Sequence, residues 1–340
     1  MNTRRQVLRL LGASLAAATR LGHADLPKFP ARQRIIIDND LAGDPDGLFQ
    51  AAHHLLSGSV DVRLIVGSHV HANEAWVPAP QASASAARAS ELLGVMGLAG
   101  RIPIVAGAEQ ALDPTAKPER TPAAEAIIAE ALREADGTPL YYAAGAGLTD
   151  LATAWLLEPR IARRLRLVWI GGPEYAGMPA PPGPSEAEYN LTIDLRAAQL
   201  IFGQSDIDIW QVPRSTYRQM LVGYTELVAR VRPTGPLGDD LVGQLEAAMR
   251  MAAAAPAEYR IAPGDSYVLG DSPLVTLTAL QSPFQPDPSS CTYEMRPRPT
   301  IDARGHYGRP AHGPAIRVYT RIDTRLTFED LYAKLAAGRR

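Results

Sequence analysis

Four aspartates lie within nine residues near the start of the chain, directly after an apolar run. The run 34–37 leads into Asp38, and Asp40, Asp44 and Asp46 follow it. Residues two apart in an extended segment point to the same side, so Asp38 and Asp40 are expected to face one site. A hard cation would offset the repulsion among these carboxylates, and Ca²⁺ accepts roughly six to eight oxygen ligands. The cluster predicts a calcium site, with a solvated acidic turn that caps the next helix as the alternative.

Short β-branched runs alternate with Ala/Leu-rich stretches over the first two thirds of the chain. This alternation is typical of βαβ units and of a parallel sheet that is covered on both faces. We therefore predict a single α/β domain with a doubly wound, mostly parallel sheet flanked by helices. Ligands of such folds bind beyond the carboxyl ends of the strands, which is where the aspartates would lie. The expected strands are 34–38, 60–66, 102–106, 140–144, 165–170 and 207–212, and the expected helices are 47–56, 81–96, 123–134, 148–157 and 197–202.

The last third of the chain is less regular. The segments 293–298 and 315–322 are expected to form strands, as an antiparallel pair at an edge of the sheet. The Pro/Gly-rich stretch 178–184 is expected to be a loop, because proline fits neither a helix interior nor a strand ladder. The helices expected here are 237–255, 272–280 and 328–337.

Composition and charge exclude several classes of function. Hydrophobic residues make up 46% of the 340 residues, so the core can be large without disulfides or a structural metal. The formal net charge is −2 and basic residues form no stripe, which argues against a nucleic-acid partner. Cys291 is the only cysteine, so an intrachain disulfide and a cysteine-rich zinc site are both excluded.

The first residues have the layout of an export signal. The pair Arg4-Arg5 precedes the apolar run 10–18, and Ala24 provides a small residue at a cleavage site. The paired arginines resemble a twin-arginine signal, so we expect a signal peptide over 1–24 and a periplasmic or secreted domain over 28–340. The alternative is an amphipathic helix of the mature protein. No stretch has the roughly 20 apolar residues of a membrane span, so no membrane contact is expected after signal removal.

The segment from Asp38 to Gly47 resembles the signature of the inosine-uridine nucleoside hydrolase family. That signature has Asp-x-Asp at the end of the first strand and paired acidic residues at the start of the next helix. Further segments resemble other motifs of the family in the same order along the chain. The resemblance therefore covers about 34–335. These segments are Gly-Leu-Thr-Asp at 147–150, Val-Trp-Ile-Gly-Gly at 168–172, Ala-Glu-Tyr-Asn at 187–190 followed by Asp194, Gly-Asp-Ser-Pro-Leu at 270–274, and Arg-Ile-Asp at 321–323.

The resemblance implies an activity and a metal site. It implies hydrolysis of the N-glycosidic bond of a ribonucleoside or a related N-riboside, with Ca²⁺ as cofactor. Asp40 stands where the family has the general base that also touches the metal, and it would take a proton from a calcium-bound water. Asp38 and Asp271 resemble metal-site carboxylates. Gly145 stands where the family offers a backbone carbonyl to the metal.

The resemblance also implies substrate contacts and an assembly state. Asp46, Glu188 and Asn190 stand where the family binds ribose hydroxyls. Ser68 stands where the family has an asparagine after the second strand, and we place it among the substrate-binding positions. Family members form dimers or tetramers, which implies a homodimer or homotetramer here.

The chain departs from the family pattern at the metal and at the leaving group. Gly47 replaces the second of the paired acidic residues, and Asp44 is the residue that could substitute for it. Gly270 stands where some members have a histidine that helps the base to leave.

Three residues are leaving-group candidates. His69 and His71 follow the second strand and could replace the missing histidine; the alternative is that they are ordinary loop histidines. Trp76 is the tryptophan best placed in a loop to stack on a base.

Two other functions compete with this interpretation. A haloacid dehalogenase-type phosphatase also places Asp-x-Asp after an apolar strand, but Leu41 and Ala42 do not fit its pattern. The second is a non-catalytic periplasmic protein that binds nucleosides or sugars. Such a protein would not need the acidic residue and the histidine that Gly47 and Gly270 replace. Retention of Asp40 together with Asp271 argues for the enzyme.

Overall fold

The protein is described by a computed structural model that covers residues 30–338. Within this range 73, 75, 116, 135–136, 182–186, 256–263, 282–289 and 312 are not described. The predicted signal peptide 1–24, and 182–184 of the predicted loop, lie outside the described residues.

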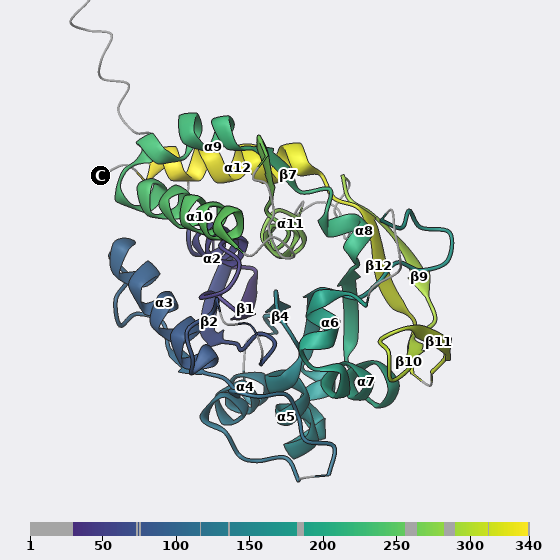
Figure 1. Cartoon of the computed structure of the whole chain (residues 1–340). Coiled ribbons are helices and arrows are strands. Elements are labelled where there is room, and N and C mark those ends of the chain that lie inside the picture. The colour runs from purple at the N-terminus through teal and green to yellow at the C-terminus, as the bar shows by residue number, and fades with distance from the viewer. Residues whose placement is uncertain are drawn as a thin grey trace, which may run out of the picture.

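An eight-stranded sheet forms the centre of the molecule, with strand order β3-β2-β1-β4-β5-β6-β12-β9 (Figure 1). Its neighbouring strands run parallel except β12 and β9, which are antiparallel. The predicted doubly wound α/β class is therefore confirmed. The strands are β1 (Gln33–Asn39), β2 (Val60–Gly67), β3 (Ile104–Ala106), β4 (Leu140–Ala144), β5 (Leu165–Ile170), β6 (Asp208–Val212), β9 (Thr292–Arg296) and β12 (Ile316–Arg321).

Helices cover both faces of this sheet, because alternate residues of each strand point to opposite faces. In β1, Ile35 and Ile37 belong to one apolar core and Ile36 to the other. In the view of Figure 1, α2, α10, α11 and α12 lie above the sheet and α4, α5 and α7 lie below it. The helices are α2 (Asp46–Leu55), α3 (Gln81–Val95), α4 (Pro122–Leu132), α5 (Thr149–Leu157), α7 (Leu195–Gln204), α10 (Pro236–Ala254), α11 (Pro273–Thr278) and α12 (Thr324–Ala337).

The strand order reverses between β1 and β4. The chain runs outward from β1 through β2 to β3 on one side, and β4 then starts the other half of the sheet on the opposite side of β1. In doubly wound folds this switch point leaves a crevice beyond the carboxyl ends of the two central strands. The acidic segment that follows β1 lies at this place.

The sequence predicted most of the long elements and missed the short ones. The antiparallel pair at 293–298 and 315–322 is confirmed, and β12 also pairs in parallel with β6. The missed elements span only three to seven residues, which is too short for a hydrophobic period to show. They are α6 (Tyr189–Ile193), α8 (Arg214–Tyr217), α9 (Tyr224–Arg230), the antiparallel pair β7 (Leu221–Gly223) and β8 (Ser266–Val268), and the pair β10 (Pro299–Ile301) and β11 (Tyr307–Pro310).

A search of the described helices found none with the length and apolar character that crossing a bilayer requires.

Candidate active site

A cavity of about 330 Å³ opens beyond the carboxyl ends of β1, β4 and β5. Five acidic side chains line it: Asp40, Asp44, Asp46, Glu188 and Asp271. They come from three segments that are up to 231 residues apart in sequence, since Asp40 follows β1 and Asp271 lies two residues before the start of α11. The fold therefore brings the separated acidic motifs together at one place.

The aspartates of the cavity disfavour one another's ionisation. Burial raises the pKa of Asp40 and Asp46 well above the ordinary value, and the neighbouring Asp271 and Asp44 raise the pKa of both further. Burial also raises the pKa of Asp271, to about 7, and that of Asp44. Carboxylates that are both buried and close together remain ionised only when a positive charge joins them.

Few donors hold these carboxylates in place. The backbone N–H of Asp271 donates to Asp46 Oδ2 at 3.1 Å. The hydroxyl of Tyr267 in β8 donates to Asp44 Oδ1 at 2.9 Å. The side-chain amide of Asn39 donates to Asp271 Oδ2 at 2.7 Å. Each contact joins groups that lie far apart in sequence or on different elements, so the arrangement depends on the folded chain.

Asp38 lies behind the cavity and does not line it. The hydroxyls of Ser68 and Tyr142 each donate to one oxygen of the Asp38 carboxylate. Burial raises the pKa of Asp38 to about 6 while these two hydrogen bonds act in the opposite direction. The strand ends at Asn39, so Asp40 belongs to the following turn and the alternation expected for Asp38 and Asp40 stops between them. Ser68 contacts Asp38 and does not line the cavity either.

Glu188 and Asn190 shape the wall of the cavity beside β4 and β5. Glu188 is buried and accepts hydrogen bonds from the backbone N–H groups of Gly172 at 2.6 Å and Leu191 at 2.9 Å. The amide of Asn190 donates to the carbonyl oxygens of Gly145 at 3.0 Å and Ile170 at 2.9 Å. Asn190 thus ties together the carboxyl ends of β4 and β5, and one acceptor site of the Gly145 carbonyl is already used.

The sequence pattern of the inosine-uridine preferring nucleoside hydrolases matches residues 35–328. The chain belongs to this family. Its members are hydrolases that act on N-glycosyl compounds, so the predicted family and enzyme class are confirmed. The haloacid dehalogenase alternative is left without support. Among curated proteins, no sequence matches the chain.

Solved structures show the same fold. A plant nucleoside hydrolase has a TM-score of 0.67 at 20% identity, over 90% of this chain and 99% of its own. The inosine-uridine preferring nucleoside hydrolase from Bacillus anthracis has a TM-score of 0.63 at 16% identity, with the same coverage of both chains. A purine-preferring ribonucleoside hydrolase from Gardnerella vaginalis also has a TM-score of 0.63 at 16% identity, again over 90% and 99%. At these identities the likeness concerns the fold alone.

Nucleoside hydrolases are metal-dependent, and the donor set of this chain fits a hard cation. Asp40, Asp44 and Asp271 offer only oxygen atoms, which Ca²⁺ and Mg²⁺ prefer. Burial raises the pKa of all three, and a cation beside them would favour their ionised form. In the part of the chain that is described, no three acidic, histidine or cysteine side chains are arranged closely enough to hold an ion as they stand.

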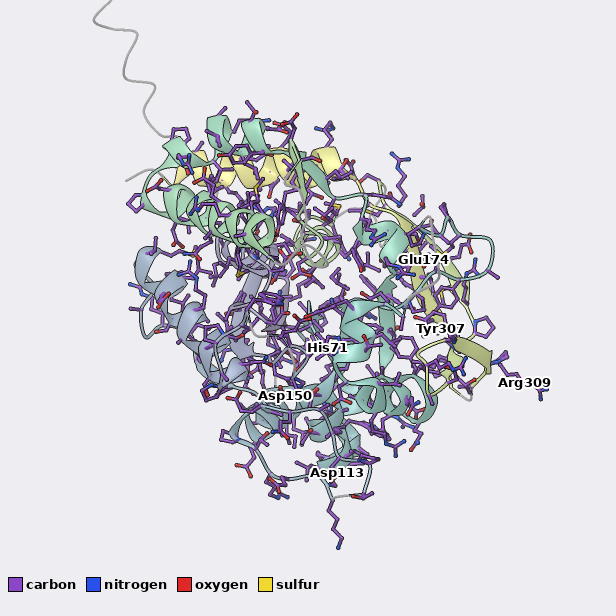
Figure 2. All side chains as sticks on the ribbon, viewed as in Figure 1. His71, Asp113, Asp150, Glu174, Tyr307 and Arg309 are labelled. Atoms are coloured by element: carbon purple, nitrogen blue, oxygen red, sulfur yellow. The ribbon has the colours of Figure 1, made fainter. Side chains whose placement is uncertain are left out.

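Aromatic side chains form the rim of this nucleoside hydrolase cavity. Trp76 and Tyr189 both line it, and each is 37% exposed. Glu74 joins them, because it accepts a hydrogen bond from the Trp76 indole and one from the Tyr189 hydroxyl at 3.3 Å. His71 packs edge-on against Tyr189 with ring centroids 4.7 Å apart, and Figure 2 shows it near the middle of the molecule, beside α6.

Neither predicted histidine lines the cavity. His71 contacts the Thr192 hydroxyl through Nε2 at 3.2 Å. His69 is buried, with Nδ1 2.8 Å from the Val70 carbonyl and Nε2 3.0 Å from the Thr149 hydroxyl. Burial lowers the pKa of His69. In this arrangement both histidines connect loops to helices around the site.

Sequence reasoning missed several residues of the cavity. Tyr217 donates its hydroxyl to Glu188 Oε1 at 2.9 Å, and Arg218 lies next to it in the lining. Both follow the carboxyl end of β6, so the rule that located the aspartates could have found them. Val268 lines the cavity and Tyr267 contacts Asp44. Both belong to the short strand β8, for which the sequence carries no comparable signal.

Proposed function

We propose that this chain hydrolyses the N-glycosidic bond of a ribonucleoside or a related N-riboside, with Asp40 as the general base and Ca²⁺ as the cofactor. The observation that carries the proposal is the convergence of Asp40, Asp44, Asp46 and Asp271 in one cavity at the switch point of a nucleoside hydrolase fold.

Asp40 is the residue best placed to accept a proton from the attacking water. It lines the cavity at the end of the central strand, and burial with neighbouring carboxylates makes its pKa high. The water oxygen attacks the anomeric carbon, the water proton goes to Asp40, and the glycosidic nitrogen leaves with the bonding electron pair.

The cation would be held by Asp40, Asp44 and Asp271, with the Gly145 carbonyl as a further oxygen beside them. A bound Ca²⁺ supplies a water of lowered pKa and offsets the repulsion among these carboxylates. Asp38 supports the site from behind the strand through Ser68 and Tyr142.

The remaining polar groups of the cavity suit a ribose. Cleavage of the bond builds positive charge on the sugar, and the carboxylates of Asp46 and Glu188 stabilise that charge. Contacts of these groups and of Asn190 with ribose hydroxyls would strengthen as the ring flattens, which raises kcat. We place the leaving group at the rim, where Trp76 and Tyr189 present aromatic surfaces.

A ribose-release assay tests this proposal. The purified mature protein is incubated with Ca²⁺ and a panel of purine nucleosides, pyrimidine nucleosides and other N-ribosides. We expect release of ribose from at least one class, and loss of release with retained binding in Asp40→Asn. Binding of nucleosides without release across the whole panel would instead support the periplasmic binding protein.

We also propose export and self-association for this chain. The twin-arginine pattern at the start of the sequence supports a periplasmic or secreted location, and the family supports a homodimer or homotetramer. Mass spectrometry of the protein from the periplasmic fraction should find a first residue at Asp25. Light scattering coupled to size-exclusion chromatography should give a molar mass two or four times that of the mature chain, which is 36.5 kDa minus the mass of the signal peptide.

A further inference from the structure

A fully buried amide lies between the two central aspartates of the site. Asn39 is the last residue of β1 and is 0% exposed. Its Nδ2 donates to Asp271 Oδ2 at 2.7 Å, and its Oδ1 accepts from the backbone N–H of Asp40 at 2.8 Å. Because one neighbour is an acceptor and the other a donor, the orientation of the Asn39 amide is determined by its contacts.

The second hydrogen of the Asn39 amide starts a buried chain of hydrogen bonds. It is donated to Gln50 Oε1 in α2 at 3.2 Å, and Gln50 in turn donates to Nδ1 of His54. His54 Nε2 is 2.8 Å from the hydroxyl of Thr278, which donates to the Leu274 carbonyl at 2.6 Å.

Every donor in this chain has an acceptor when His54 is neutral and carries its proton on Nε2. Burial lowers the pKa of His54 to about 3, which agrees with a neutral ring. The chain thus runs without a gap from Asp271, through β1 and α2, back to α11, the helix that Asp271 precedes.

Two glycines provide the space for the Asn39 amide. A Cβ atom at Gly145 would lie 2.4 Å from Asn39 Nδ2, and a Cβ atom at Gly47 would lie 2.9 Å from the same atom. Gly145 follows β4 and Gly47 is the second residue of α2, so the amide fills a slot between two elements. A side chain at position 47 would collide with the Asn39 amide, so the glycine there permits the amide to lie where it does.

We propose that Asn39 is a positioning residue of the active site, which directs the Asp271 carboxylate and holds the backbone of Asp40 so that both face the same cavity. Gly47 and Gly145 leave the space in which the Asn39 amide reaches Asp271. The inference rests on the proposed function, because it assigns to Asn39 a part in the geometry that Asp40 and Asp271 require. Asn39 itself does not line the cavity and touches no substrate.

The first experiment compares Asn39→Ala and Gly47→Ala with the parent protein. Loss of a group that orients metal-site carboxylates costs about 10- to 100-fold in activity or metal affinity. We expect Asn39→Ala to lower kcat by that factor with a smaller change in KM, and to weaken Ca²⁺ binding in calorimetry. Thr327→Val is the matched control, because its buried hydroxyl contacts Thr276 away from the cavity.

Gly47→Ala separates positioning from folding. Alanine favours a helix more than glycine does, which offsets part of the cost of moving the buried Asn39 amide, so the thermal midpoint should fall less than in Asn39→Ala. Its new methyl group displaces the Asn39 amide, so kcat and Ca²⁺ affinity should fall although every polar group remains. In the double variant, Gly47→Ala should add no further loss to Asn39→Ala, because the amide it displaces is gone. Additive losses, or losses that follow the thermal midpoint, would contradict the proposal.

Crystal structures of the parent and of Asn39→Ala give a readout that does not depend on hydrolysis. We expect the Asp271 carboxylate to change orientation in the variant. If the parent releases no ribose but Asp271 reorients and Ca²⁺ binding weakens, the proposed function fails and the role of Asn39 stands. If the parent is active and Asn39→Ala keeps its kcat, Ca²⁺ affinity and Asp271 orientation within error, the role of Asn39 is refuted.

Discussion

Two groups of buried carboxylates lie on either side of the ends of β1 and β4, and their surroundings differ. Behind the strands, Asp38 accepts hydrogen bonds from the hydroxyls of Ser68 and Tyr142. Asp194, also buried, accepts from two backbone N–H groups and from the Thr149 hydroxyl, each at 2.8 to 2.9 Å. These carboxylates are supplied with donors from the protein itself.

In front of the strands, the neighbours of each carboxylate include other carboxylates. The pKa of Asp40 is raised first by burial and next by Asp271 and Asp44, and that of Asp46 by the same neighbours. Burial raises the pKa in both groups, but hydrogen bonds from Ser68 and Tyr142 oppose the rise at Asp38, whereas neighbouring carboxylates add to it at Asp40 and Asp46. The comparison teaches that burial alone does not mark a functional carboxylate; burial beside a cavity that other carboxylates share does.

The largest expected effect comes from Asp40→Asn. We expect kcat/KM for ribose release to fall by about 10²- to 10⁴-fold, because the general base is removed. The free energy of unfolding without Ca²⁺ should stay equal or increase, because one of the repelling buried carboxylates is gone.

Asp38→Asn is the control with the same chemical change behind the strand. Its amide would present N–H groups to hydroxyl donors, so this variant should lose stability more than activity. Equal losses of activity in both variants, measured by steady-state kinetics, would break the distinction between the two groups.

Removal of Ca²⁺ should have an effect of comparable size that can be reversed. Chelation should abolish ribose release, and returning Ca²⁺ should restore it and raise the thermal midpoint. A ligand at a free concentration of a hundred times its Kd stabilises the folded state by about 2.7 kcal/mol. Calorimetric melts with and without Ca²⁺ measure this directly. A thermal midpoint that does not respond to Ca²⁺ at any concentration would mean that the carboxylates in front of the strands bind no cation. They would then not differ in function from those behind the strands.

The pH dependence of stability should divide between the two groups. Asp150 is a buried residue of α5 near Asp38, and it accepts a hydrogen bond from the backbone N–H of Ala108 at 3.0 Å. Burial raises the pKa of Asp38 to about 6, of Asp271 to about 7 and of Asp150 to about 8. Because these values exceed those of the unfolded chain, the folded state binds protons more tightly. The stabilising contribution of these groups to the free energy of unfolding is complete below about pH 4, and it is lost as the pH rises through about 6 to 8.

Urea unfolding between pH 5 and pH 8 tests this division. Without Ca²⁺, the free energy of unfolding should fall over this range by on the order of a few kcal/mol. Saturating Ca²⁺ should remove the share of this pH dependence that Asp271 causes. The shares that Asp38 and Asp150 cause should remain. A pH dependence that Ca²⁺ leaves unaltered would show that Asp271 does not contact the ion.

The smallest expected effect is that of Tyr142→Phe. It removes one of the two donors to the Asp38 carboxylate and adds no charge. A buried acceptor that loses its partner costs about 1 to 3 kcal/mol, so the free energy of unfolding should fall by that amount. Activity should fall only slightly, since Asp38 does not line the cavity. A large loss of kcat with unchanged stability would instead place Asp38 in the catalytic group.

How much of the site could be predicted depends on sequence distance. Asp40, Asp44 and Asp46 share one short segment after an apolar strand, and the rule that ligands bind beyond strand ends was enough to place them. Asp271 was identified only by resemblance to a family motif, because no pattern of charge or period connects it with Asp40. Tyr267 lies on a strand of three residues, which is too short to be recognised.

The sequence by itself determined the fold class and the strand that carries the acidic segment, and it predicted a cation site at the end of that strand. These follow from local periodicity and residue type. Only the tertiary structure decided that Asp38 faces two hydroxyls while Asp40 faces the cavity, and that the Asn39 amide fills the space left at Gly47. The physical reason is that a side chain's neighbours, and hence its charge state, depend on where its strand ends and on which distant segments pack against it.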